Sequence, residues 1–106
     1  MTRIRFTPHA VATLNEIAQW TYTHFGAAQA ERYRVDLIQG CDRLENPSPS
    51  ERSCAGLVSS ASGELFYVRA GMHFIVFRRR EGEVAILDFL HVRSDLASRL
   101  VSFSDS

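Results

Sequence analysis

Hydrophobic and polar residues alternate at the start of the chain and then recur with a helical period. Ile4 and Phe6 alternate with polar neighbours, which predicts a short strand with one buried face. Thr7 and Pro8 are typical of a helix N-cap and of the first helical position. The stripe expected to be buried continues as far as Gly26, which favours the end of a helix. Its members are Val11, Leu14, Ile17, Ala18, Thr21, Tyr22 and Phe25.

A second helical stripe begins almost at once, near Ala27. The helix is predicted to stop before Pro47, because Asn46 precedes a proline and is biased away from helical dihedral angles. Two helices joined by one or two residues form an antiparallel hairpin, so their stripes are expected to pack on each other and on a sheet. The second stripe consists of Ala30, Tyr33, Leu37, Ile38, Cys41 and Leu44.

The second half of the chain has the pattern of a β-meander. Residues 46–62 are rich in Ser, Pro, Ala and Gly, which predicts a long connection. It is not a domain linker, because neither half could bury its apolar face alone. Strands are predicted at 65–70, from 72 to about 79 and from 84 to about 92, with a tight turn at Glu81–Gly82.

These elements predict one α+β domain over residues 1–106, in the order β-α-α-β-β-β. The helical hairpin should pack on a mostly antiparallel four-stranded sheet and leave its other face partly open. The tail from residue 94 is expected to begin a short helix. Ser94 would cap that helix, and Leu96, Leu100 and Val101 would dock it.

Composition and motifs limit the cellular location of the protein and the kinds of chemical site that it can contain. No apolar run approaches the roughly 20 residues that span a bilayer, and the N-terminus lacks the continuous apolar core of a signal peptide, so a cytoplasmic protein without membrane contact is expected. Cys41 and Cys54 have neither metal-ligand spacing nor the pattern of a disulfide framework. None of the four histidines pairs with another ligand at metal spacing. No phosphate-binding glycine loop or nucleophile elbow occurs. We therefore expect no metal, no cofactor and no catalytic residue.

All twelve basic residues are arginine, balanced by twelve acidic residues. The absence of lysine excludes any mechanism that needs a catalytic lysine. Arginine binds phosphate and carboxylate bidentately and stays charged when desolvated. Two interpretations remain open, codon bias in a GC-rich genome and use of arginine at an interface.

Polar and cationic side chains gather at one end of the predicted sheet. Tyr67 and Arg69 share one face of a strand by the two-residue period, and so do His91 and Arg93. Arg79 lies in a run of three arginines. If neighbouring strands bring these side chains together, they form a surface for an anionic target. The alternatives are an acid–base and phosphate clamp for RNA cleavage, a fixed structural hydrogen bond, or a solvated strand face whose arginines protect a sheet edge.

The order and spacing of several segments resemble a known family. They are the segment AVATLNEI from Ala10, then Gly26, Ala30, Tyr33, Leu44 and Arg52, and finally ILDFLHVRSD from Ile86. From Ile4 to about Asp95 the chain resembles ParE-type toxins of the RelE/ParE superfamily of bacterial type II toxin–antitoxin systems. The family often shows Gly-Arg after the second helix, whereas this chain has Glu51-Arg52. This difference leaves the conformation of that loop and the role of Arg52 open.

The resemblance implies a cytosolic toxin made beside a ParD-like antitoxin, which wraps around a hydrophobic groove and a basic face. Candidate antitoxin contacts are the large apolar residues Trp20, Tyr22, Phe66 and Phe74. The ParE branch is associated with inhibition of DNA gyrase, which needs neither catalysis nor direct nucleic-acid binding by the toxin. The alternatives are a ribosome-dependent mRNA endoribonuclease of the RelE type and a degenerate member that only pairs with its antitoxin. The lack of lysine, and of any tyrosine after Tyr67, favours ParE.

Overall fold

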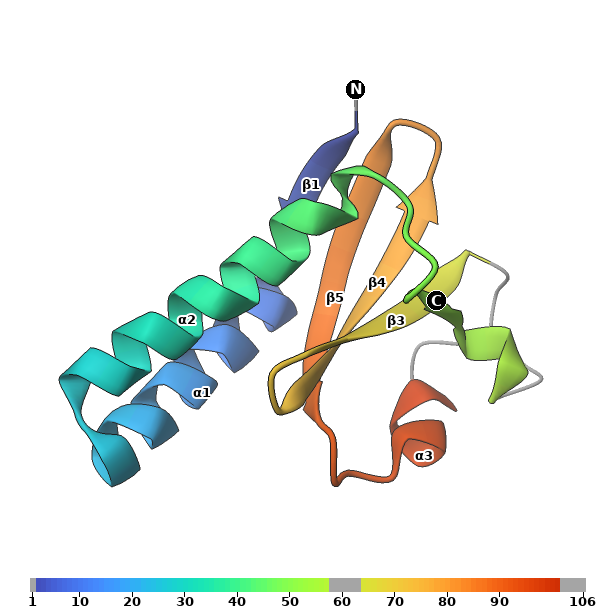
Figure 1. Cartoon of the computed structure of the whole chain (residues 1–106). Coiled ribbons are helices and arrows are strands. Elements are labelled where there is room, and N and C mark those ends of the chain that lie inside the picture. Colours follow the sequence, from blue (N-terminus) through green and yellow to red (C-terminus); the bar gives the residue numbers. More distant parts are fainter. Residues whose placement is uncertain (1, 58–63, 102–106) are drawn as a thin grey trace.

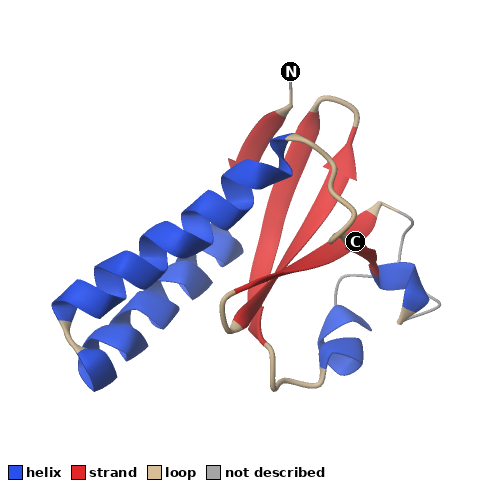
Figure 2. Ribbon diagram, viewed as in Figure 1, coloured by secondary structure: helices blue, strands red, loops and turns tan. Residues whose placement is uncertain are grey.

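Two antiparallel helices lie on one face of a twisted sheet, and a short third helix lies on the other face (Figures 1 and 2). The computed structural model describes residues 2–57 and 64–101. None of the helices in these ranges is both long and apolar enough to cross a bilayer. The elements are β1 (Arg3–Phe6), α1 (Pro8–Phe25), α2 (Ala27–Asp42), the 3-10 helix η1 (Arg43–Glu45), β2 (Arg52–Ser53), the 3-10 helix η2 (Cys54–Gly56), β3 (Leu65–Ala70), β4 (His73–Arg80), β5 (Glu83–His91) and α3 (Leu96–Val101).

The helical hairpin has the predicted boundaries. The Thr7 side chain accepts a hydrogen bond from the Ala10 backbone at 3.2 Å and donates one to the Ile86 carbonyl at 2.9 Å. The same residue therefore caps α1 and fixes it to the sheet. Gly26 has a φ of +91°, so it reverses the chain between α1 and α2 where a side chain would be strained. The second helix gives way to η1 just before Asn46.

In the part of the chain that the structure describes, the sheet has five strands, in the order β1-β5-β4-β3-β2, and not the four that the pattern predicted. β1 runs parallel to β5, and the other pairs are antiparallel. The additional strand, β2, lies in the segment predicted as a connection, where Arg52 pairs with Tyr67 and Ser53 with Phe66. Two residues are too few to show alternation, so this strand leaves no hydrophobic pattern in the sequence.

Each face of the sheet has its own apolar core. Under the helical hairpin, Leu14, Leu37, Ile75, Phe77 and Ile86 belong to one cluster, and the last four are fully buried or nearly so. Burial of one such side chain stabilises the fold by about 1.5–3 kcal/mol. The opposite face, predicted to be partly open, is covered by α3 and η2 through a second cluster, which contains Cys54, Leu65, Val76, Leu90 and Leu100.

The third helix differs from its prediction at both ends. Asp95 and not Ser94 caps it, because the Asp95 carboxylate accepts from the Ser98 backbone at 3.3 Å and from the Ser98 hydroxyl at 2.8 Å. The Ser94 hydroxyl instead donates to the His91 carbonyl. Leu100 is buried as expected, whereas Val101 is half exposed.

Candidate functional site

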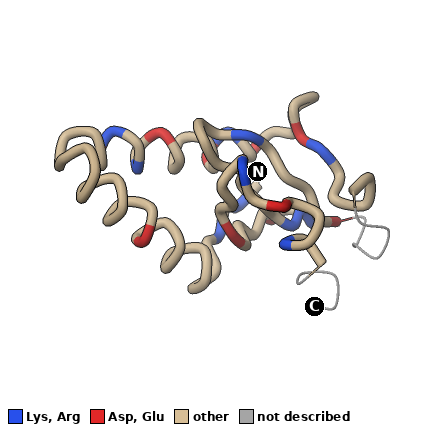
Figure 3. The backbone as a smooth tube through the Cα atoms, turned by 90° about the horizontal axis from the view of Figure 1, so that it is seen from below, with Lys and Arg blue, Asp and Glu red and all other residues tan. Residues whose placement is uncertain are grey.

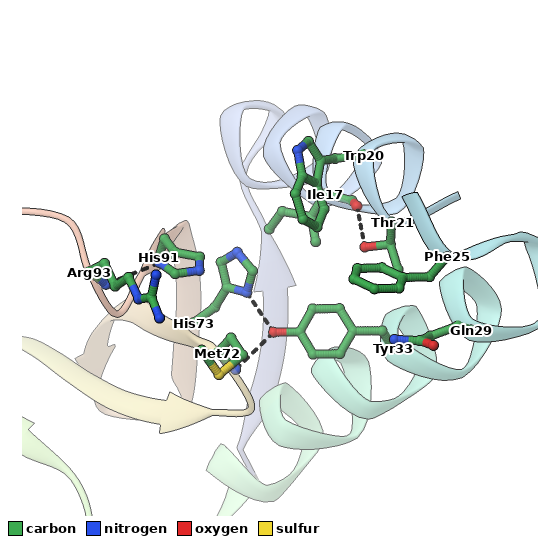
Figure 4. A pocket seen from close by; sticks show the side chains of 10 residues that line it. All are labelled: Ile17, Trp20, Thr21, Phe25, Gln29, Tyr33, Met72, His73, His91 and Arg93. Atoms are coloured by element: carbon green, nitrogen blue, oxygen red, sulfur yellow. Dashed lines mark hydrogen bonds between the residues drawn. The ribbon is translucent and has the colours of Figure 1, made fainter. Parts of the chain in front are cut away.

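A cavity of about 550 Å³ opens where the connected ends of α1 and α2 meet the ends of β4 and β5 (Figure 4). One wall is apolar and comes mainly from the helices, and the other is polar and comes from the strands. Its lining residues are Ile17, Trp20, Thr21, Phe25, Gln29, Tyr33, Met72, His73, His91 and Arg93. The sequence pattern did not predict this cavity, because its lining comes from four separate segments.

The tight turn between β3 and β4 positions Tyr33. Gly71 has a φ of +61°, and a Cβ placed there would lie 2.8 Å from Tyr33 Cε1. Only glycine therefore lets this turn pack directly against the tyrosine ring. The Tyr33 hydroxyl oxygen accepts from the Met72 backbone at 3.0 Å and lies 2.6 Å from His73 Nδ1.

The sheet register brings two histidines together. His73 and His91 are directly opposite each other on β4 and β5, and their ring centroids are 5.2 Å apart with one ring edge-on to the other. Burial, with a further contribution from His91, lowers the pKa of His73 to about 4. The His73 ring is therefore neutral at physiological pH. Burial is also the main cause of a raised pKa for Tyr33, which keeps its proton.

Three aromatic side chains at the connected end of the helical hairpin remain exposed. Trp20, Tyr22 and Phe25 have 57–58% of their surface accessible, and Trp20 stacks on His24 with a centroid separation of 4.0 Å. The helical period placed Tyr22 and Phe25 on the buried stripe, which is wrong. Val11, also predicted there, is 43% exposed. The buried residues of α1 are Ala10, Leu14 and Thr21, so Val11 and Tyr22 lie outside the buried side, and Phe25 lies at the open cavity.

The four predicted antitoxin contacts do not form one surface. Trp20 and Tyr22 are exposed on α1. Phe66 is half-buried under the helical hairpin, where it stacks on Phe77. Phe74 lies on the other face of the sheet and meets Tyr67 edge-on at 5.5 Å.

The two predicted pairs of target-binding residues do not converge. β4 separates β3 from β5. Tyr67 packs on the α3 side of the sheet, and the two-residue period places Arg69 on the same face. His91 and Arg93 instead line the cavity on the helical side. Arg69 Nε donates to the Gly71 carbonyl at 3.0 Å, a contact within the turn.

Arg79 is committed to internal contacts. Its Nη2 lies 2.8 Å from both carboxylate oxygens of Glu51, and its Nη1 donates to the Leu44 carbonyl at 3.0 Å. Figure 3 shows basic and acidic positions interspersed along the chain, in line with other ion pairs such as that of Arg80 with Glu64. Glu51 thus closes the loop that precedes β2 onto β4.

Tyr33 was expected only as a core residue, although its hydroxyl group reaches into the cavity. The signal for a polar role is the pairing of Tyr33 with His73, two residues that are 40 positions apart. No local spacing rule reports such a contact.

Comparison with known proteins shows the family and the fold. Residues 4–96 match the family model described as ParE toxin of type II toxin–antitoxin system, parDE. The chain is 34% identical to Toxin ParE of Escherichia coli over 94% of each chain, and 30% identical to Toxin ParE1 of Mycobacterium tuberculosis over 93% of this chain and 98% of that one. A solved structure of the chromosomal ParDE TA system from P. aeruginosa has the same fold, with a TM-score of 0.69 and 17% identity over 86% of this chain and 96% of that one. The chain belongs to the ParE toxin family of type II toxin–antitoxin systems.

Proposed function

We propose that this toxin arrests growth by binding DNA gyrase, without catalysis, and that a ParD-type antitoxin neutralises it. Membership of the ParE family supports this target, because the ParE branch is associated with gyrase inhibition. The solved ParDE system with the same fold supports an antitoxin partner. The observation that carries the antitoxin proposal is the group of exposed aromatic side chains on α1.

The proposed antitoxin contact is centred on Trp20, Tyr22 and Phe25. Large apolar side chains grouped on a protein surface are typical of a surface that binds another protein. Tryptophan and tyrosine contribute strongly to the binding energy of such surfaces. Phe66 and Phe74, which are half-buried on opposite faces of the sheet, have supporting roles at most.

The proposed target contacts are Tyr67, Arg69, His91 and Arg93. Among the described residues, neither Arg69 nor Arg93 has an acidic side chain as an ion-pair partner. Both guanidinium groups are therefore available to an acidic surface. Arg79 is left out, because Glu51 already binds its guanidinium group.

The target is tested by expressing the chain without its antitoxin and following DNA synthesis and protein synthesis separately. We expect DNA synthesis to stop first, and the purified toxin to inhibit gyrase supercoiling. Arg69→Gln and Arg93→Gln should weaken both effects, whereas the matched variant Arg80→Gln should not. Early loss of mRNA with continued replication would instead identify an endoribonuclease. Normal growth would identify a degenerate member of the family.

The partner is tested with the neighbouring reading frame, which is expected to encode a short ribbon-helix-helix protein. That protein should co-purify with this chain and restore growth. Trp20→Ala or Tyr22→Ala should weaken the complex by about 1–3 kcal/mol, as removal of a buried aromatic contact does. Val11→Ala removes apolar surface from the other end of α1 and serves as the control. Equal affinities for all three variants would place the antitoxin elsewhere.

A further inference from the structure

Hydrogen bonds determine the proton position of His91 and guide our assignment for His73. The Tyr33 oxygen already accepts from the Met72 backbone, so we assign its hydroxyl proton to the short bond to His73 Nδ1. His91 Nδ1 accepts from the Arg93 backbone N–H at 3.1 Å. An imidazole nitrogen that accepts a hydrogen bond carries no proton, and a neutral ring then carries its proton on Nε2. Each ring therefore has an Nε2–H donor.

This assignment does not favour a metal ion held by the two Nε2 atoms. A metal-binding histidine coordinates through an unprotonated nitrogen, while its other nitrogen usually donates a hydrogen bond. Nδ1 of His91 is an acceptor, and Nδ1 of His73 is one in the arrangement that we assign. The residues that line the cavity include neither a carboxylate nor a thiol.

Arg93 is the arginine among the residues that line this cavity, and Arg69 lies close enough to act electrostatically on Tyr33. Arg93 is exposed, and within residues 2–57 and 64–101 its guanidinium group has no ion-pair partner. The His73 ring is neutral because of its lowered pKa, and the Nδ1 atom of His91 accepts a hydrogen bond from the Arg93 backbone. One cation with two N–H donors matches a monoanion better than a dianion.

The opposite wall is aromatic and aliphatic. Figure 4 shows the Trp20 and Phe25 rings on the helical side of the cavity, across from the imidazole rings, with Tyr33 between the two sides. Trp20 and Phe25 are more than half exposed, so their rings have free surface for a ligand. A flat apolar group can pack on these rings and bury area that now faces water.

We propose that the cavity binds a carboxylate carried on a flat or branched apolar group. The carboxylate would accept from the two imidazole N–H groups and from Arg93, while the apolar group would lie against Trp20 and Phe25. We assign its source to an acidic residue next to an apolar residue in the antitoxin segment that covers α1. The assignment of the carboxylate to the antitoxin rests on the proposed function, whereas the carboxylate-binding site itself does not.

The only tryptophan in the chain lines this cavity, so its fluorescence reports directly on binding. The purified toxin is titrated with 4-phenylbutyrate at fixed pH and ionic strength, and the probe's neutral amide serves as the comparison ligand. We expect a saturable change in emission with the acid and at least about tenfold weaker binding of the amide. A tenfold difference corresponds to about 1.4 kcal/mol.

Two variants test the donors, and one serves as a matched control. Arg93→Gln removes the cation. His91→Asn keeps an acceptor near the Arg93 N–H but removes the Nε2–H donor. Each should weaken binding of the acid by about tenfold or more. Arg3→Gln makes the same charge change on β1, away from the cavity, and should bind as the wild type does. Circular dichroism confirms that each variant is folded.

Three results would overturn the site: no saturable change, equal binding of acid and amide, or unchanged binding in both folded donor variants. A further titration uses the toxin–antitoxin complex to test the source. The complex should no longer bind 4-phenylbutyrate. If it binds the probe as tightly as the free toxin, the antitoxin is not the source. In that case the carboxylate site stands, and gyrase inhibition, measured separately, is unaffected.

Discussion

Removal of the Glu51 carboxylate should destabilise the fold far more than removal of an exposed acidic residue. The side chains of Glu51 and Arg79 are only 7% and 18% exposed, and the two contacts of 2.8 Å form a closely matched ion pair. Loss of one partner from a buried pair costs about 3–5 kcal/mol, because the other charge stays desolvated. Arg79 keeps its contact with the Leu44 carbonyl, but its Nε has no hydrogen-bond partner among residues 2–57 and 64–101.

We therefore expect Glu51→Ala to lower the free energy of unfolding by about 3 kcal/mol, near the lower end of that range, because Arg79 retains some contact with water. For a chain of this length, that loss corresponds to a fall in Tm of about 12 °C. The assay is urea unfolding at pH 7 followed by circular dichroism. The double variant Glu51→Ala/Arg79→Met should cost at least about 2 kcal/mol less than the sum of its two single variants.

The pair Arg80–Glu64 provides the control. Its side chains are 60% and 47% exposed, and its N–O distance is 2.9 Å. An exposed pair contributes at most about 1 kcal/mol, so Glu64→Ala should have a small effect. If Glu51→Ala costs no more than Glu64→Ala, or if the Glu51 and Arg79 variants are additive, the ion pair does not hold the loop onto β4.

The remaining predictions concern the cavity and the cores. Burial lowers the pKa of His73 to about 4, so below pH 6.5 the unfolded chain binds a proton that the folded chain does not. The free energy of unfolding should therefore fall by about 2 kcal/mol between pH 6.5 and pH 4.5. In urea titrations, His73→Asn should show a smaller fall over the same pH range. Gly71→Ala should lower the free energy of unfolding by about 2 kcal/mol, because its methyl group would meet Tyr33. Gly82→Ala, at a φ of +77° but with open space around it, should lower it by about 1 kcal/mol, and thermal melts of both variants measure the difference. Burial raises the pKa of Cys54 to about 11, so a thiol reagent at pH 8 should label it only as fast as the chain opens; labelling at the rate of a free thiol would contradict its burial.

Local patterns were sufficient for the elements that carry their own signal. The Thr7–Pro8 cap, the reversal at Gly26 and the alternation in β3 to β5 each depend on neighbouring residues, and all were predicted. The two-residue β2 was missed, because its only determinant is pairing with β3. The cap of α3 was assigned to Ser94, one residue too early, because serine and aspartate favour the same position.

The candidate site is formed by contacts between residues that are far apart in the sequence, and local spacing does not predict such contacts. The run of three arginines predicts that Arg79 binds the target. Its actual partner, Glu51, lies 28 residues away in a connection, which the local sequence does not indicate. Tyr67 and His91 do not meet, because β4 lies between their strands and the two side chains face opposite sides of the sheet. The cavity requires Tyr33 from α2 and His73 from β4, which only the packed fold brings together.

The parallel pairing of β1 with β5 has a consequence for synthesis in the cell. Arg3 pairs with Glu83, so β1 is synthesised 80 residues (83 − 3) before its partner in β5. Such distant pairing is slow, because a long loop must close before any hydrogen bond compensates its entropy. Incomplete chains cannot complete the sheet. The edge of the sheet formed by β1 can therefore be completed only after β5 has been synthesised.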